Sequence, residues 1–219
     1  PGIAQGYFHP QGPAGTAIQA VQEQAGPISV GVVGLGVGAL AALGRAGDAF
    51  VFYEIDPAVE RLATDPSLFT YLSDAQADVS VDIGDGRLRL DASGARHDLL
   101  IIDAFSSDAI PAHLLTVEAF QLYRKVTGGG PVILHVSNRH LNLAPVVGAT
   151  ATAAGLQSWL WEYDPDLAAL GTGARSSRWT ALSADPDLGL PGWWEPIPTD
   201  RRPWTDDYSN IMGAIELRQ

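Results

Sequence analysis

The sequence has no cysteine and few basic residues, and each shortage excludes a class of function. Without cysteine the chain can form no disulfide, use no thiolate nucleophile and hold no cysteine-ligated zinc ion. Only 13 residues are Lys or Arg against 25 Asp or Glu, which gives a net charge of −12. This balance argues against a nucleic-acid partner, because nucleic-acid surfaces need clustered positive charge. It is compatible with a small cationic substrate.

The sequence also lacks a long apolar run. Its best candidate, Val30 to Leu43, is interrupted by glycines. It falls short of the ~18 consecutive apolar residues that a membrane span requires. No basic and then apolar signal segment follows Pro1. We therefore expect no membrane insertion by these residues. The sequence opens without Met, so a preceding membrane part is left open.

Apolar runs alternate with helical patterns along most of the chain. Hydrophobic residues make up 46% and charged residues 17%, enough for one sizeable core. Strands separated by helices predict a mostly parallel sheet with helices on both faces, followed by an antiparallel addition. We expect a lead-in segment at 1–26 and a single Rossmann-like catalytic domain at 27–219. The predicted strands are 29–33, 49–53, 79–83, 98–103, 131–136, 156–163 and 178–183, and the helices are 16–24, 37–43, 57–63, 116–126 and 143–154, with a loop at 185–202.

The residues that follow the strands point to a ligand site. In an open α/β sheet, ligands bind where parallel strands end. The first strand is followed by Gly34, Gly36 and Gly38, which allow the backbone to pass close to a ligand. Glu54 lies twenty residues after Gly34, where a carboxylate can accept ribose hydroxyls. Glycine turns also serve tight packing, but with Asp85 at the next strand end we predict nucleoside binding.

The glycine spacing is GxGxG, which is typical of folds that bind S-adenosylmethionine. This resemblance implies that Glu54 holds the ribose and that Asp85 meets the adenine amino group. Asp56 and Gly86 belong to the same donor site.

An ordered set of motifs resembles the polyamine aminopropyltransferase (spermidine/spermine synthase) family. The match is nearest to the bacterial branch that is often fused to a membrane transporter-like region. It runs from about Tyr7 to Ile211. The motifs are VGVVGLGVGAL, FYEIDP, GDGRLRL, DLLIIDAFSSDAIPAHL, VILHVSNRHL and PWTDDYSNI.

The family resemblance implies a reaction and a set of residues. The propylamine group of decarboxylated S-adenosylmethionine, a co-substrate, passes to a putrescine-like polyamine, and methylthioadenosine leaves. No metal or bound redox cofactor is implied. Asp103 is the expected general base and amine anchor, because the attacking ammonium must be held and deprotonated. The implied amine-binding residues are Asp108, Asp206, Asp207 and Tyr208, with Tyr7 and His9 near the family's acceptor-side region.

The sequence departs from the family pattern in three respects. Val37 stands where the glycine loop usually carries an Asp that grips the aminopropyl ammonium. Asp108 follows Asp103 by five residues instead of three. The family's N-terminal β-hairpin, which helps to form its dimers, has no match here. A homodimer is therefore left open. We expect a cytoplasmic location, either for this chain alone or as the cytoplasmic domain of a longer membrane protein.

Other residues have structural interpretations. His135 and His140 are five apart across a strand end, which disfavours a shared metal ion. His135 is interpreted as a core histidine, and the tryptophans at 159, 161, 179, 193 and 194 as core and loop packing.

Three alternatives to aminopropyl transfer remain open from the sequence. The first is an S-adenosylmethionine-dependent methyltransferase on the same fold. The second is an intramolecular reaction in which the donor's own amine closes a ring. The third is a non-catalytic nucleoside-binding domain.

Overall fold

The computed structural model describes residues 4–104, 110–138, 140–165 and 173–215. Its α-helices are α1 (Pro13–Ala25), α2 (Pro57–Ala63), α3 (Gly86–Ser93), α4 (Val117–Val126) and α5 (Ala144–Ala153). Its strands are β1 (Ser29–Val33), β2 (Ala49–Glu54), β3 (Asp78–Ile83), β4 (Leu99–Ile102), β5 (Val132–His135), β6 (Gln157–Tyr163), β7 (Ser177–Ser183) and β8 (Glu195–Pro196). Short 3₁₀ helices are η1 (Ala39–Leu43), η2 (Ala112–Leu114) and η3 (Met212–Ala214).

The strands form one sheet in the order β3-β2-β1-β4-β5-β7-β6-β8. The first five strands in this order are parallel, and β7, β6 and β8 continue the sheet with antiparallel pairing. The order reverses direction at β1, so the edge where β1 and β4 end is the expected ligand crevice. The fold predicted from the sequence, a parallel Rossmann-like sheet with an antiparallel addition, is confirmed.

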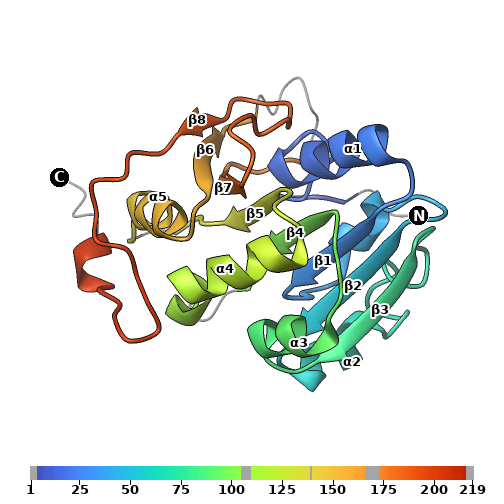
Figure 1. Cartoon of the computed structure of the whole chain (residues 1–219). Coiled ribbons are helices and arrows are strands. Elements are labelled where there is room, and N and C mark those ends of the chain that lie inside the picture. The colour runs from blue at the N-terminus through green and yellow to red at the C-terminus, as the bar shows by residue number, and fades with distance from the viewer. Residues whose placement is uncertain (1–3, 105–109, 139, 166–172, 216–219) are drawn as a thin grey trace.

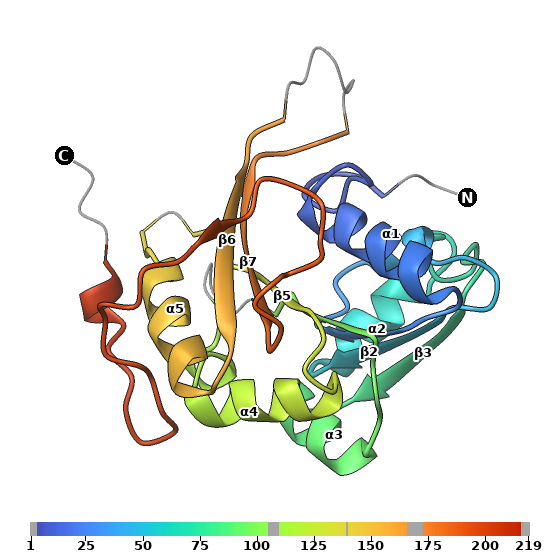
Figure 2. The same ribbon diagram turned by 45° about the horizontal axis from the view of Figure 1, so that its top comes forward.

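Helices cover both faces of the sheet (Figures 1 and 2). On one face α3, α4 and α5 pack over Leu100, Ile102 and Leu134. On the other, α1, η1 and α2 pack over residues that include Phe50 and Phe52. The inward side chains of β1, β4 and β5 are almost fully buried, which explains why these strands are nearly continuous apolar runs.

Helix ends are fixed where the sequence places suitable caps. Asp56 accepts a hydrogen bond from the Ala58 amide at 2.8 Å, and Pro57 is the first residue of α2. Thr116 caps α4 by accepting from the Ala119 amide.

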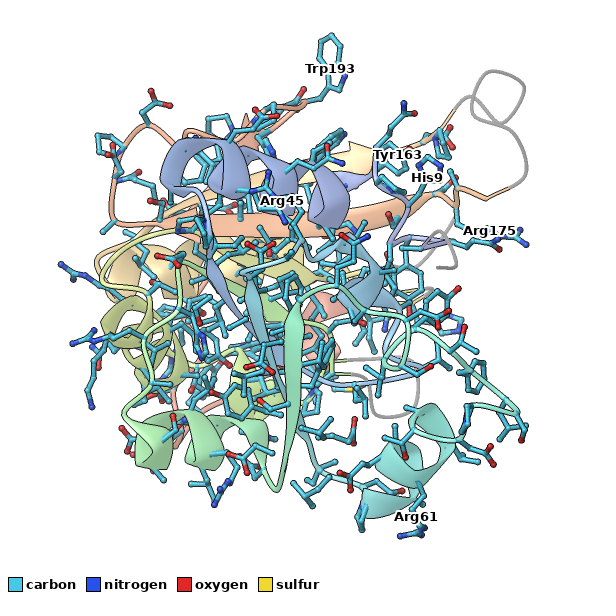
Figure 3. The ribbon with its side chains drawn as sticks, turned by 90° about the vertical axis from the view of Figure 1, so that its right-hand side faces the viewer. His9, Arg45, Arg61, Tyr163, Arg175 and Trp193 are labelled. Carbon is cyan, nitrogen blue, oxygen red and sulfur yellow. The ribbon has the colours of Figure 1, made fainter. Side chains whose placement is uncertain are left out.

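Two local predictions were wrong, and two elements, α3 and the short β8 within the predicted 185–202 loop, were not predicted. The segment 37–43 forms only the short η1, which begins at Ala39 after the left-handed Gly38. No helix was predicted at α3, because Arg87-Leu-Arg-Leu90 alternates polar and apolar residues as a strand does. The side chain of Trp193 is 82% exposed and projects away from the molecule (Figure 3), so it is not packed.

No helix in the described ranges has the length and apolar character needed to cross a membrane.

Candidate functional site

The glycine loop after β1 adopts a backbone that only glycine takes easily. Gly34, Gly36 and Gly38 have φ angles of 101°, 53° and 77°. A Cβ at Gly34 would lie 2.4 Å from the carbonyl oxygen of Asp103, whereas one at Gly36 would meet nothing within 4 Å. Gly34 therefore lets the ends of β1 and β4 approach, and Gly36 leaves open space beside the loop.

The carboxylate of Glu54, at the end of β2, organises this loop. Its Oε2 accepts a hydrogen bond from the Leu35 amide at 2.9 Å, and its Oε1 accepts from the Asp56 amide at 2.9 Å. Glu54 is buried, and because a carboxylate has about four acceptor positions, these two amides do not use all of them. Ile55, the next residue, is 69% exposed and offers an apolar surface beside these acceptors.

Asp85 and Gly86 lie at the end of β3, where α3 begins. Asp85 caps α3 by accepting from the Leu88 amide at 3.0 Å, and its Oδ2 lies 3.4 Å from His113 Nε2. A Cβ at Gly86 would lie 2.5 Å from Val33, so this glycine allows α3 to start close against β1. The predicted donor residues thus follow three neighbouring strands.

Asp103 follows β4, and its carboxylate is hydrogen-bonded to His135, the last residue of β5. Ile102 pairs with Leu134, so the next residues, Asp103 and His135, lie side by side. His135 Nδ1 is 2.8 Å from Asp103 Oδ1, and the two side chains are 6% and 11% exposed respectively. Burial raises the pKa of Asp103, and the contact with His135 opposes this rise.

Tyr7 brings the N-terminal segment to the same place. Its ring lies 4.3 Å from the His135 ring. Burial and, to a lesser extent, the charge of Asp103 raise the pKa of Tyr7 to about 12. The phenol is therefore protonated at neutral pH and can act as a hydrogen-bond donor.

His9 lies further along the N-terminal segment. A Cβ at Gly12 would contact both the His9 carbonyl oxygen and the Tyr163 ring, at 3.2 and 3.6 Å. Figure 3 shows the His9 side chain near Tyr163. His9 accepts a hydrogen bond from the Gln11 amide, and no described contact joins it to Asp103.

The predicted amine-binding residues of the C-terminal segment lie elsewhere in the described structure. Asp206 forms a two-pronged ion pair with Arg87 of α3, at 2.6 and 2.7 Å, and also accepts from Thr116 Oγ1. The Arg87 guanidinium lowers the pKa of Asp206. With Asp85 and His113, Asp206 and Arg87 line an open hollow of about 600 Å³ between α3 and α4.

The neighbours of Asp206 add no contact to Asp103. Asp207 is exposed, and the Tyr208 ring lies 3.6 Å beneath the Arg202 guanidinium. Asp108 lies outside the described residues.

Sequence reasoning missed two functional candidates. His135 is buried, as predicted, but it also contacts Asp103. The signal was available, since both residues end neighbouring apolar strands. Arg87 was not considered, because its contact with Asp206 spans 119 positions of sequence.

The arrangement has two parts that meet at Gly34. One is a glycine loop with carboxylates suited to a nucleoside, and the other is a buried carboxylate with a histidine and a tyrosine. Both parts lie at the ends of the parallel strands of a Rossmann-like α/β fold.

Comparison with solved structures agrees with this fold. A probable spermidine synthase from Corynebacterium glutamicum is 17% identical with a TM-score of 0.55, over 78% of this chain and 62% of that one. Human methyltransferase-like protein 13, solved with SAH, is 20% identical with a TM-score of 0.57, over 78% and 80%. The spermidine synthase of Thermotoga maritima is 14% identical with a TM-score of 0.54, over 93% and 70%.

No protein-family model matches the chain, and no curated protein matches it. The solved structures therefore establish the fold alone. The chain spans about three fifths of the length of the Corynebacterium protein, 62%.

Proposed function

We propose that this protein is a transferase that uses an S-adenosylmethionine-type donor, and that the group it moves is aminopropyl. The donor would be decarboxylated S-adenosylmethionine and the acceptor a cationic polyamine such as putrescine. The similar folds of spermidine synthases and methyltransferases support the donor class. The choice of aminopropyl transfer depends on the site of this chain.

The choice of aminopropyl transfer rests on one observation: in the Asp103–His135 pair the carboxylate, and not the imidazole, is placed to meet a substrate. Both imidazole nitrogens are engaged internally, with Asp103 at 2.8 Å and with Ser137 Oγ at 2.8 Å. The carboxylate is therefore the group left to meet a substrate. A carboxylate holds an ammonium through charge-assisted hydrogen bonds, whereas deprotonation of a hydroxyl would favour an accessible imidazole.

The donor residues would bind the nucleoside and leave its sulfonium beside Asp103. Glu54 would accept the ribose hydroxyls, and Asp85 the adenine amino group. The glycine loop would allow close approach, since Gly34 packs directly on the backbone of Asp103. This placement reduces the entropy that the reaction would otherwise lose on bringing donor and acceptor together.

The chemistry then needs one proton transfer and one displacement. Amines are almost wholly protonated at neutral pH, so the acceptor ammonium first gives a proton to Asp103. The freed nitrogen pair attacks the propyl carbon bonded to sulfur. The C–N bond forms, the C–S bond breaks, and its electron pair stays on the sulfur of methylthioadenosine. The sulfonium supplies its own leaving group.

Product analysis tests the proposal. The protein is incubated with decarboxylated S-adenosylmethionine, with and without putrescine, and separately with S-adenosylmethionine, and all products are identified by mass spectrometry. We expect methylthioadenosine and an aminopropylated amine only when both decarboxylated donor and putrescine are present. Acceptor-independent methylthioadenosine would indicate ring closure, a methylated product would indicate methyl transfer, and binding without turnover would indicate a nucleoside-binding domain.

A further inference from the structure

His135 occupies a position in which every polar atom of its ring has a partner. Nε2 lies 2.8 Å from Ser137 Oγ, and Nδ1 lies 2.8 Å from Asp103 Oδ1. The Ser137 oxygen already accepts a hydrogen bond from the Arg178 amide at 2.8 Å. We assign the serine hydroxyl as donor to Nε2 and the imidazole hydrogen to Nδ1, directed at Asp103, because a carboxylate can only accept.

Aromatic rings on both sides hold the imidazole in this orientation. The Trp179 ring is stacked on it with centroids 4.5 Å apart and an interplanar angle of 15°. Tyr7 packs against it at 4.3 Å. Trp179 is fully buried, and β7 is paired with β5 at this point, His135 opposite Trp179. The ring therefore cannot rotate without disturbing the core.

Only one oxygen of the Asp103 carboxylate is used in this arrangement. Oδ1 faces His135, and within the described ranges Oδ2 has no hydrogen-bond partner. We propose that His135 is a positioning residue for Asp103: its Nδ1–H fixes Oδ1 and leaves Oδ2 for the acceptor ammonium. This inference rests on the proposed function, in which Asp103 is the base.

The same contact has a consequence for acidity. Burial raises the pKa of Asp103, and the hydrogen bond from His135 lowers it. Among the described residues, Tyr7 of the N-terminal segment is a further titratable group that faces the pair, and it stays protonated at neutral pH. The neighbouring Trp179 and Ser137 do not titrate. His135 therefore keeps Asp103 ionised to lower pH than burial alone would allow.

Two variants separate this role from structural support. His135→Phe keeps a ring between Tyr7 and Trp179 but removes the donor. His135→Asn loses the ring but places an amide N–H where Nδ1 stood. In the pH profile of kcat/KM, we expect the acid limb of His135→Phe to move to higher pH. Its kcat/KM at acidic pH should be at least ~10-fold below wild type, with the gap closing as pH rises. His135→Asn should keep the acid limb near the wild-type position.

A direct titration keeps the inference independent of turnover. The carboxyl carbon of Asp103, labelled with ¹³C, is followed by NMR in wild type and in His135→Phe. We expect a higher pKa for Asp103 in the variant. An unchanged pKa, or an acid limb that does not move, would overturn the positioning role. A shifted pKa in a protein that transfers no aminopropyl group would instead contradict the proposed function alone.

Discussion

Gly34 and Asp103 touch through their backbones. The ideal Cβ of residue 34 would lie 2.4 Å from the Asp103 carbonyl oxygen, and the Asp103 amide donates to the Val33 carbonyl at 2.8 Å. The loop that we assign to the donor and the carboxylate that we assign to the acceptor are therefore parts of one rigid edge. A transferase needs this proximity, because both substrates must meet at one carbon.

Gly34→Ala tests the importance of this contact. An alanine at this position would have to adopt a φ of 101°, and its Cβ would clash with the Asp103 backbone. A small shift of the chain relieves neither problem. We expect it to lose more stability in urea unfolding than Gly94→Ala, and to bind methylthioadenosine at least ~10-fold more weakly. Gly94 has a φ of 61° with no atom near its Cβ position, so its variant should lose only about 1–2 kcal/mol. Equal losses in the two variants would contradict the argument.

Glu54→Gln tests the nucleoside assignment. A charge-assisted hydrogen bond to a ribose hydroxyl contributes on the order of 1.5–3 kcal/mol. We expect methylthioadenosine affinity, measured by calorimetry, to fall at least ~10-fold. Glu23→Gln, on the exposed side of α1, is the matched control and should bind normally. Normal binding by Glu54→Gln would remove the assignment, as long as its thermal melt shows an intact fold.

The buried charge of Asp103 should reduce stability. Burial raises the folded-state pKa, so between the ordinary aspartate value and the raised one the folded protein binds more protons than the unfolded chain. Stability therefore falls as pH rises through that window. Asp103→Asn should melt at a higher temperature than wild type at pH 8, and the difference should shrink as pH is lowered. A variant that melts lower at pH 8 would contradict this account.

The Arg87–Asp206 ion pair should change the stability of the fold with pH in the opposite direction to Asp103. The guanidinium lowers the folded-state pKa of Asp206, so its contribution is present at neutral pH and is lost as pH falls through the acidic range. The Asp206 side chain is 45% exposed, which limits the contribution to about 0.5–1 kcal/mol. Asp206→Asn should lose this amount at pH 7 and little at acidic pH or high salt. Asp207→Asn, which removes an exposed neighbour, should lose nothing at either pH.

Local sequence patterns predicted most of the fold. β1, β4 and β5 are buried on both faces, so each is a continuous apolar run that could be recognised as a strand from the sequence. Asp56 and Thr116 cap helices by contacts within three residues. The helix α3 could not be found in this way. Only Gly86 and Leu90 of its residues are buried, so its sequence shows no apolar stripe at helical spacing.

Candidate site residues could be named from the sequence where they follow strands, but the long-range contacts between them could not. Gly34 and Glu54 became candidates through the rule that ligands bind at the ends of parallel strands, and Asp103 through the resemblance to aminopropyltransferases. The link from Asp103 to His135 required the register of β4 against β5. The contact of Asp206 with Arg87 joins residues far apart in sequence, and no local pattern reports such a contact.

The most direct test of the account is the split between binding and turnover in Asp103→Asn. The substitution keeps size and hydrogen-bonding capacity but removes the charge that would hold and deprotonate the ammonium. We predict that aminopropyl transfer to putrescine falls ~10²–10⁴-fold, while methylthioadenosine affinity stays near the wild-type value, because the nucleoside contacts follow other strands. Wild-type turnover by Asp103→Asn, or loss of nucleoside binding together with turnover, would contradict the role of Asp103 as the base.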